Sequence, residues 1–361
     1  RLRLQKTGEE AAEPFVLEVI RGGHFPNDRI EETKINEVKD VLDKYIFIIE
    51  NNTQSKSEEP DIRLYNWILG IAACEIEEVI SPSLKEKALI EYMAESMKEA
   101  IRVNEGKTNK GKITEEEKNV QIYIACRKAL FKLDRQIISY ELLKNKYPNW
   151  QALPPHQLRE VALNIFSIWN GIEKELNHPL ADKFYKICER ADTGFLILGD
   201  ILSQKAMETQ KILSDPGLLE SLIREAYQKR LSKLKGRMSR AALYSTISIF
   251  ISKILIAFVI EIPFDKYVLG QFDYRILGLN VFIPPLLMIF LVSTIKPPAK
   301  ENLNKVILEV MKIVYEKEKK EVYQIKLPGK RRGIFRSVII ALYILTFLIF
   351  ATLNRAEASI L

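Results

Sequence analysis

The sequence is poor in the side chains that enzymes most often use for metal binding and nucleophilic catalysis. It has only three histidines and three cysteines among its 361 residues. Cys74, Cys126 and Cys188 are more than fifty residues apart and form no C-x-x-C pair, so neither a zinc site nor a dithiol redox motif is indicated. Each lies in an apolar helical pattern, which predicts small buried hydrophobic residues in a reducing compartment. We therefore expect no catalytic set, no metal and no cofactor.

Two short motifs come close to known sites and lack a necessary part. The segment Gly106–Lys112 has the G-x-x-x-x-G-K spacing of a phosphate-binding loop. Ile113 follows it where a hydroxyl is needed, and a helical pattern precedes it where a strand is needed. The Glu-x-x-His spacing of di-iron bundles occurs once, at Glu175 and His178, whereas such a site needs two copies. We interpret the first as a solvated loop and His178 as a turn residue.

Long apolar stretches are the most informative feature of the chain. They cover residues 241–262, 276–295 and 337–353, and only Lys253 and Glu261 among them are charged. Because a helix rises about 1.5 Å per residue and the hydrocarbon core of a bilayer is about 30 Å thick, about 17–25 apolar residues are enough to cross it. The sequence therefore predicts a multi-pass membrane protein with three transmembrane helices.

The basic residues around these stretches predict the orientation. Residues 224–240 contain seven Lys or Arg, the loop 261–275 contains two, and residues 296–336 contain twelve. Lys and Arg accumulate on the cytoplasmic side of membrane proteins. We expect a multi-pass protein of the cell (plasma or inner) membrane, with its N-terminal region in the cytoplasm and the 261–275 loop outside.

The overall charge of the chain does not indicate nucleic-acid binding. The formal net charge is +7 and the pI about 9.0. Residues 1–223, however, hold 31 basic against 37 acidic residues, so the basic excess lies beside the apolar stretches. Phosphate backbones are bound by Lys and Arg, which an acidic domain lacks in excess. The expected partner is instead the bilayer, with anionic headgroups beside a basic collar formed by Arg237, Arg240, Lys330, Arg331, Arg332 and Arg336.

The remaining sequence reads as helices and predicts an all-α fold: a cytosolic helical bundle or array followed by the transmembrane helices. The expected parts are an extended lead-in (1–30), a helical unit (31–146), a Pro-rich linker (147–156), a second helical unit (157–240) continuing into the first span, and a membrane domain (241–355) with a cytosolic amphipathic helix at about 301–320.

Local patterns make further predictions for the helical units. Apolar spacing carries one helix through Ile101, and strand signal is thin throughout. The capping-box spacing of Thr114 and Glu117 opens a helix that is expected to continue to about Lys144. Glu75, which shares a helix face with another glutamate, is expected to be solvated.

Two polar features inside the membrane domain form a candidate site. Lys253 lies near the middle of the first span, where an ionisable group costs about 2.5–3.5 kcal/mol on insertion scales. Pro284 and Pro285 lie at the centre of the second span and release carbonyls near Asn280. Lys253 could donate to these acceptors, or its long stem could carry the ammonium to the headgroup region.

Two functions of different classes fit these features. The first is a non-enzymatic assembly or scaffold component, with a protein partner or a homo-oligomer. The alternative is a transporter or channel subunit built around Lys253 and the Pro284–Pro285 kink. A membrane-bound enzyme ranks third, behind these two, because the sequence offers no matched nucleophile, base and metal.

Overall fold

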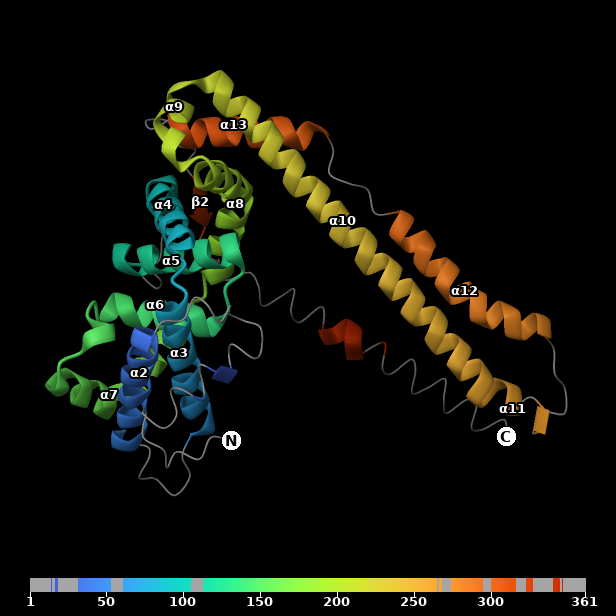
Figure 1. The fold of residues 1–361 in the computed structure, drawn as a ribbon, viewed down its shortest axis with the longest axis horizontal. Coiled ribbons are helices and arrows are strands. Elements are labelled where there is room, and N and C mark those ends of the chain that lie inside the picture. The colour runs from blue at the N-terminus through green and yellow to red at the C-terminus, as the bar shows by residue number, and fades with distance from the viewer. Residues whose placement is uncertain are drawn as a thin grey trace. The chain divides into compact units, whose positions relative to one another are not determined.

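A computed structural model describes residues 32–52, 61–104, 113–264, 266–267, 274–294, 300–315 and 323–326, together with 14, 17–18, 340–344 and 346. These residues are almost all helical, which agrees with the predicted all-α class (Figure 1). The chain divides into two compact units, residues 1–190 with 321–361 and residues 191–320.

The first unit is built from seven helices and two short strands within the described residues. These are α2 (Glu32–Asn51), α3 (Ile62–Ile80), α4 (Leu84–Ala100), β1 (Ile101–Asn104), α5 (Glu115–Phe131), α6 (Arg135–Lys146), η2 (Trp150–Ala152), α7 (Pro155–Leu176) and β2 (Tyr323–Lys326). The helix α8 (Ala181–Gln204) begins in the first unit and ends in the second.

The core of the first unit lies where α2, α3, α6 and α7 pack together. Trp150 is completely buried in it, beside the buried Tyr45. The Pro-rich segment 147–156 thus lies inside this unit. Its prolines exclude a long helix, and the single turn of η2 places the Trp150 ring in the core.

The predicted helix from Thr114 to Lys144 is two helices. The capping box is present, since the Glu117 N–H donates to Thr114 Oγ1 and the Thr114 N–H donates to Glu117 Oε2. Lys132 then adopts a left-handed conformation with φ of 53°, which ends α5. Asp134 opens α6 by accepting hydrogen bonds from two backbone N–H groups.

The expectation of a helix through Ile101 is also corrected. Residues Ile101–Asn104 form β1, which pairs in parallel with β2, so that Ile101 lies opposite Tyr323 and Val103 opposite Ile325. Ile101 and Ile325 are buried. The partner strand is far away in sequence, and the apolar alternation of only four residues gave little local signal.

The second unit contains η3 (Ala206–Glu208), α9 (Thr209–Ser214), α10 (Pro216–Ile256), the π-helical η4 (Ala257–Glu261), α11 (Ile262–Phe264), α12 (Tyr274–Ser293) and α13 (Lys300–Tyr315). Asp215 caps α10 by accepting from the N–H groups of Gly217 and Leu218. The first turns of α10 pack with α8, α9 and the apolar face of α13. At Gly194 of α8 an added Cβ would lie 3.1 Å from atoms of Glu309 and Ile313, so this glycine permits close approach of α13.

From Ala241 onward, α10 is apolar and mostly exposed. Residues Pro216–Phe264 form one continuous helical segment, and almost none of its most apolar part is buried. In Figure 1 this long helix, in yellow, carries α12 alongside its second half, in agreement with their packing. This is the only described helix that is long and apolar enough to cross a membrane.

The predicted number of three spans is therefore not supported. In the second predicted span, the apolar part of α12 is Leu277–Val292. This part alone is too short to count as a helix that crosses a membrane. The third, 337–353, lies outside the described residues except for 340–344 and 346. The described residues contain one helix, α10 with its continuation to Phe264, that is long and apolar enough to cross a membrane.

Candidate functional site

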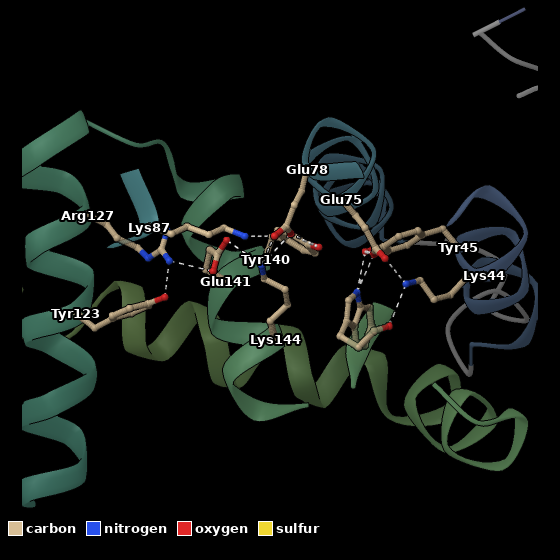
Figure 2. Close-up of polar contacts among 11 residues, drawn as sticks. Lys44, Tyr45, Glu75, Glu78, Lys87, Tyr123, Arg127, Tyr140, Glu141 and Lys144 are labelled. Carbon is tan, nitrogen blue, oxygen red and sulfur yellow. Dashed lines mark hydrogen bonds and ion pairs between the residues drawn. The ribbon is translucent and has the colours of Figure 1, made fainter. Parts of the chain in front are cut away.

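Three carboxylates on α3 and α6 form ion pairs with lysine and arginine side chains inside the first unit. Glu75 and Glu78 come from α3, and Glu141 comes from α6. Figure 2 shows Glu75 facing α2, whereas Glu78 and Glu141 face the side chains of α4, α5 and α6. The result is two adjacent polar clusters rather than a single one.

The first cluster is a buried ion pair. Glu75 is completely buried, and its Oε1 lies 2.5 Å from the Nζ of Lys44. Its Oε2 accepts from the Tyr45 hydroxyl at 2.8 Å and from the Trp150 indole N–H at 2.9 Å. Lys44 also donates to the backbone carbonyl of Trp150 at 3.0 Å. This pair connects α2, α3 and η2 across the core.

Burial dominates the titration of this cluster. It lowers the pKa of Lys44, against the opposing effect of the nearby Glu75 carboxylate. It also raises the pKa of Tyr45, an effect that Glu75 increases. Tyr45 therefore remains a neutral hydrogen-bond donor at physiological pH.

The second cluster is a network of two carboxylates and three cations. Glu78 accepts from Lys144 at 2.8 Å, from the Tyr140 hydroxyl at 2.7 Å and from Lys87. The other carboxylate, Glu141, forms ion pairs of 3.0 Å with Lys144 and 2.9 Å with Arg127. The network holds α3, α4, α5 and α6 together.

A small cavity of about 260 Å³ opens beside this network. Lys87 lines it, and burial together with the charge of Lys144 lowers the pKa of the Lys87 ammonium. Cys74 also lines it, and burial, assisted by Asp134 and Glu77, raises the pKa of this thiol to about 12. A thiol with that pKa holds little thiolate at neutral pH, so Cys74 is a poor nucleophile.

The two clusters are better suited to structural support than to catalysis. Each oxygen of the three carboxylates accepts at least one hydrogen bond or ion pair from the chain itself. A general acid or base needs an oxygen that can exchange a proton with a substrate. Within the described residues, no group of three or more His, Cys, Asp and Glu side chains is arranged to hold a metal ion.

The expectation that Glu75 is solvated was wrong, and the sequence contained a signal that could have corrected it. Glu75 follows Leu64, Ile68 and Ile71 at steps of three and four, so it lies on the buried stripe of α3. The exposed carboxylate of this turn is Glu77. The missing information was the cation, because Lys44 is 31 residues away on another helix.

The other single-residue expectations have mixed outcomes. The Nδ1 of His178 accepts a hydrogen bond from the Leu180 N–H at 3.2 Å, as expected of a turn histidine. Cys126 and Cys188 are fully buried, as expected, and their sulfur atoms lie 3.7 Å apart, a proximity that their sequence spacing did not indicate. The glycine-rich loop at 106–112 lies outside the described residues.

The proposed intramembrane residues lie on two helices that pack together. Lys253 is on α10, and Asn280, Pro284 and Pro285 are on α12. The ring centroids of Phe250 and Phe282 are 5.7 Å apart, so these two residues lie at the same height along the paired helices. In an antiparallel pair, Lys253 then lies about one turn from Phe250 in the direction of Asn280, and the two prolines lie in the opposite direction. Pairing of Lys253 with Asn280 stays a prediction.

If the Lys253 ammonium donates hydrogen bonds to acceptors of α12, Lys253→Leu should lower the melting temperature of the detergent-solubilised protein. Each unsatisfied buried acceptor costs about 1–3 kcal/mol. The loss should shrink when Pro284 and Pro285 are also replaced by Ala, because helix bonding then satisfies the carbonyls. An unchanged or higher melting temperature for Lys253→Leu alone would rule out the pairing and favour a lysine that reaches the headgroups.

The basic collar is only partly described. Arg237 and Arg240 are exposed on α10, immediately before the apolar part of that helix. Lys330, Arg331, Arg332 and Arg336 lie outside the described residues. Lipid contact by the collar remains a prediction.

Comparison of the chain with protein families, with curated proteins and with solved structures gives no match.

Proposed function

We propose that this chain is a membrane-anchored scaffold, in which a helical cytosolic domain is held at a bilayer by α10 and α12 and presents a surface for a partner protein. The observation that carries the proposal is the exposed apolar part of α10. Leu243, Ile247, Ile251 and Leu255 are each at least 45% exposed. A contiguous apolar surface of this length is stable in lipid and costly in water.

The helix α12 supports a second crossing. Its apolar part, Leu277–Val292, is shorter than that of α10, but all 20 residues of the helix together span about 30 Å at 1.5 Å per residue, the hydrocarbon thickness of a bilayer. Several of its apolar side chains, among them Leu286, Ile289 and Phe290, are more than half exposed. Residues 337–353 supply the third crossing of the proposal, and the collar residues lie beside anionic headgroups.

The paired carboxylates support a scaffold over an enzyme. The three buried or half-buried carboxylates Glu75, Glu78 and Glu141 are engaged with cations of the same unit. Such networks fix the relative positions of helices, which is what a docking platform requires.

One observation favours the alternative of a transporter or channel subunit. The π-helical turn Ala257–Glu261 begins four residues after Lys253, and π-helical turns often occur at functional sites. Pro263 offers a structural cause for the same turn, because it lacks an N–H and its ring would collide with the carbonyl of Val259 in a regular helix. The scaffold is therefore the preferred proposal.

Thiol labelling tests the anchor and its orientation. A cysteine replacing Asp265 should react with a membrane-impermeant maleimide in intact cells. One replacing the fully exposed Met207 should react only after the membrane is opened. The prediction follows from the seven, two and twelve basic residues of segments 224–240, 261–275 and 296–336. Both cysteine variants carry Cys74→Ser, so that this native thiol does not react. Labelling of Met207→Cys from outside would contradict the proposal.

A further inference from the structure

A large groove opens between α4, α5, α6 and α7 of the first unit, and it shares no lining residue with the small cavity beside the second cluster. Its volume is about 1100 Å³. Apolar side chains that line it include Val120, Leu142, Ile168 and Ile172, one or more from each of α5, α6 and α7. A space of this size exceeds the usual range for small-molecule pockets, about 300–1,000 Å³, and suits a segment of polypeptide.

The polar lining of the groove is strongly acidic. Among the described residues that line it, the carboxylates are Glu91, Glu95, Glu116, Glu117 and Glu175, and the cations are Lys98 and Lys146. Lys98 is already paired with Glu95 at 2.5 Å. The groove therefore carries a formal excess of three negative charges, five against two. Such a field attracts and orients a cationic partner.

One of the groove carboxylates, Glu175, is held in place from behind by a buried amide. The Gln121 side chain is 1% exposed, and its Nε2 donates to the Glu175 backbone carbonyl at 2.9 Å and to the Glu175 carboxylate at 3.1 Å. Its Oε1 has no hydrogen-bond partner within the described residues. The contact of Gln121 with Glu175 joins α5 to α7 and fixes the position of this groove carboxylate.

We propose that this groove docks a basic amphipathic helix of a partner protein, with the apolar face of that helix on the floor and its Lys or Arg side chains at the glutamates. The proposal rests on the scaffold function, for which it names the surface and the chemistry of the partner. Helix-in-groove recognition needs an apolar floor and complementary charges, and both are present here. An acidic partner would leave the carboxylates without opposite charges. A purely polar partner would leave the apolar floor without apolar contacts.

One position allows the groove to be blocked without disturbing the core. Gly171 of α7 lines the groove, is exposed, and has no heavy atom within 4 Å of an added Cβ. Gly171→Trp should fill part of the groove while keeping α7 helical. Gly236 of α10 has equally open surroundings and lies outside the groove, so Gly236→Trp is the matched control.

The test uses full-length protein in phosphatidylcholine nanodiscs and a fluorescein-labelled 16-residue helical peptide with three leucines on one face and five lysines elsewhere. Fluorescence anisotropy, with empty nanodiscs as the blank, should show saturable binding that weakens as salt increases. Gly171→Trp should weaken it at least tenfold, as should the combined Glu91→Gln, Glu116→Gln and Glu175→Gln. Gly236→Trp and the surface change Asp40→Asn on α2 should leave binding unchanged.

The outcomes separate the groove from the anchor. Absence of saturable binding, or equal binding by the wild type and a folded Gly171→Trp protein, would overturn the groove proposal. Equal binding of a peptide with glutamate in place of lysine would do the same. None of these results would change the thiol labelling at Asp265, which tests the anchor independently of the groove.

Discussion

Replacing Glu75 by Leu should lower the free energy of unfolding of the first unit by about 3–5 kcal/mol at pH 7. The change leaves the Lys44 ammonium, 8% exposed, without its counter-ion in the core. Lys44 could lose its proton instead. For a lysine of pKa about 10.4 this costs about 4.6 kcal/mol at pH 7, at about 1.36 kcal/mol per pH unit. The two routes give penalties of similar size.

The dependence on pH identifies the buried cation as the cause. At pH 9.5 deprotonation of a free lysine costs only about 1.2 kcal/mol, so the effect of Glu75→Leu should shrink as the pH rises. A lost packing contact would not show this trend. The tryptophan fluorescence of Trp67, Trp150 and Trp169, all in the first unit, can report the unfolding.

Two further proteins complete this test. The double change Lys44→Met with Glu75→Leu should recover most of the lost stability, because this cluster then holds no buried charge and the Trp150 indole still donates to the Tyr45 hydroxyl at 3.1 Å. Glu77→Leu makes the same substitution at an exposed position of the same helix and should change stability by less than about 0.5 kcal/mol. A large effect of Glu77→Leu, or no recovery in the double change, would contradict the buried-pair account.

Replacing Ile251 by Asp should strongly reduce insertion of α10 into membranes. Ile251 is 53% exposed and lies in the middle of the apolar stretch 241–262. A central aspartate costs about 2.5–3.5 kcal/mol on insertion scales, which corresponds to about a hundredfold decrease in the insertion constant. An insertion assay that scores glycosylation of a tagged 261–275 loop measures this constant.

The matched control for Ile251→Asp is Gln228→Asp, which introduces the same side chain at an exposed position of α10 before the apolar stretch. It should leave insertion unchanged. Equal glycosylation of the two variants would mean that Ile251 does not enter the hydrocarbon, and the anchor proposal would then fail.

Features set by local sequence were predictable. The capping box at Thr114 and the apolar stretch that makes the end of α10 a candidate span each follow from residues close together in the chain. Capping and apolar periodicity depend on neighbours within one or two turns, so a single sequence carries their signal.

Features set by distant residues were not predictable. The partner of β1 is β2, far along the chain, and the burial of Glu75 depends on Lys44 from another helix. The break between α5 and α6 was missed for a different reason, since Lys132 is a rare non-glycine residue at positive φ and gives no recognisable stop signal. The groove likewise exists only where four helices meet.

The most direct test of the membrane anchor is the depth of nitroxide labels along α10. Positions 244, 251 and 258 are exposed and seven residues apart, so they lie on one helical face at intervals of about 10.5 Å. In liposomes, collisions with oxygen relative to a water-soluble nickel complex should be greatest at Ile251 and lower at Tyr244 and Phe258. High accessibility to the nickel complex at all three labels, or low accessibility of all three to both reagents, would contradict a bilayer-spanning α10.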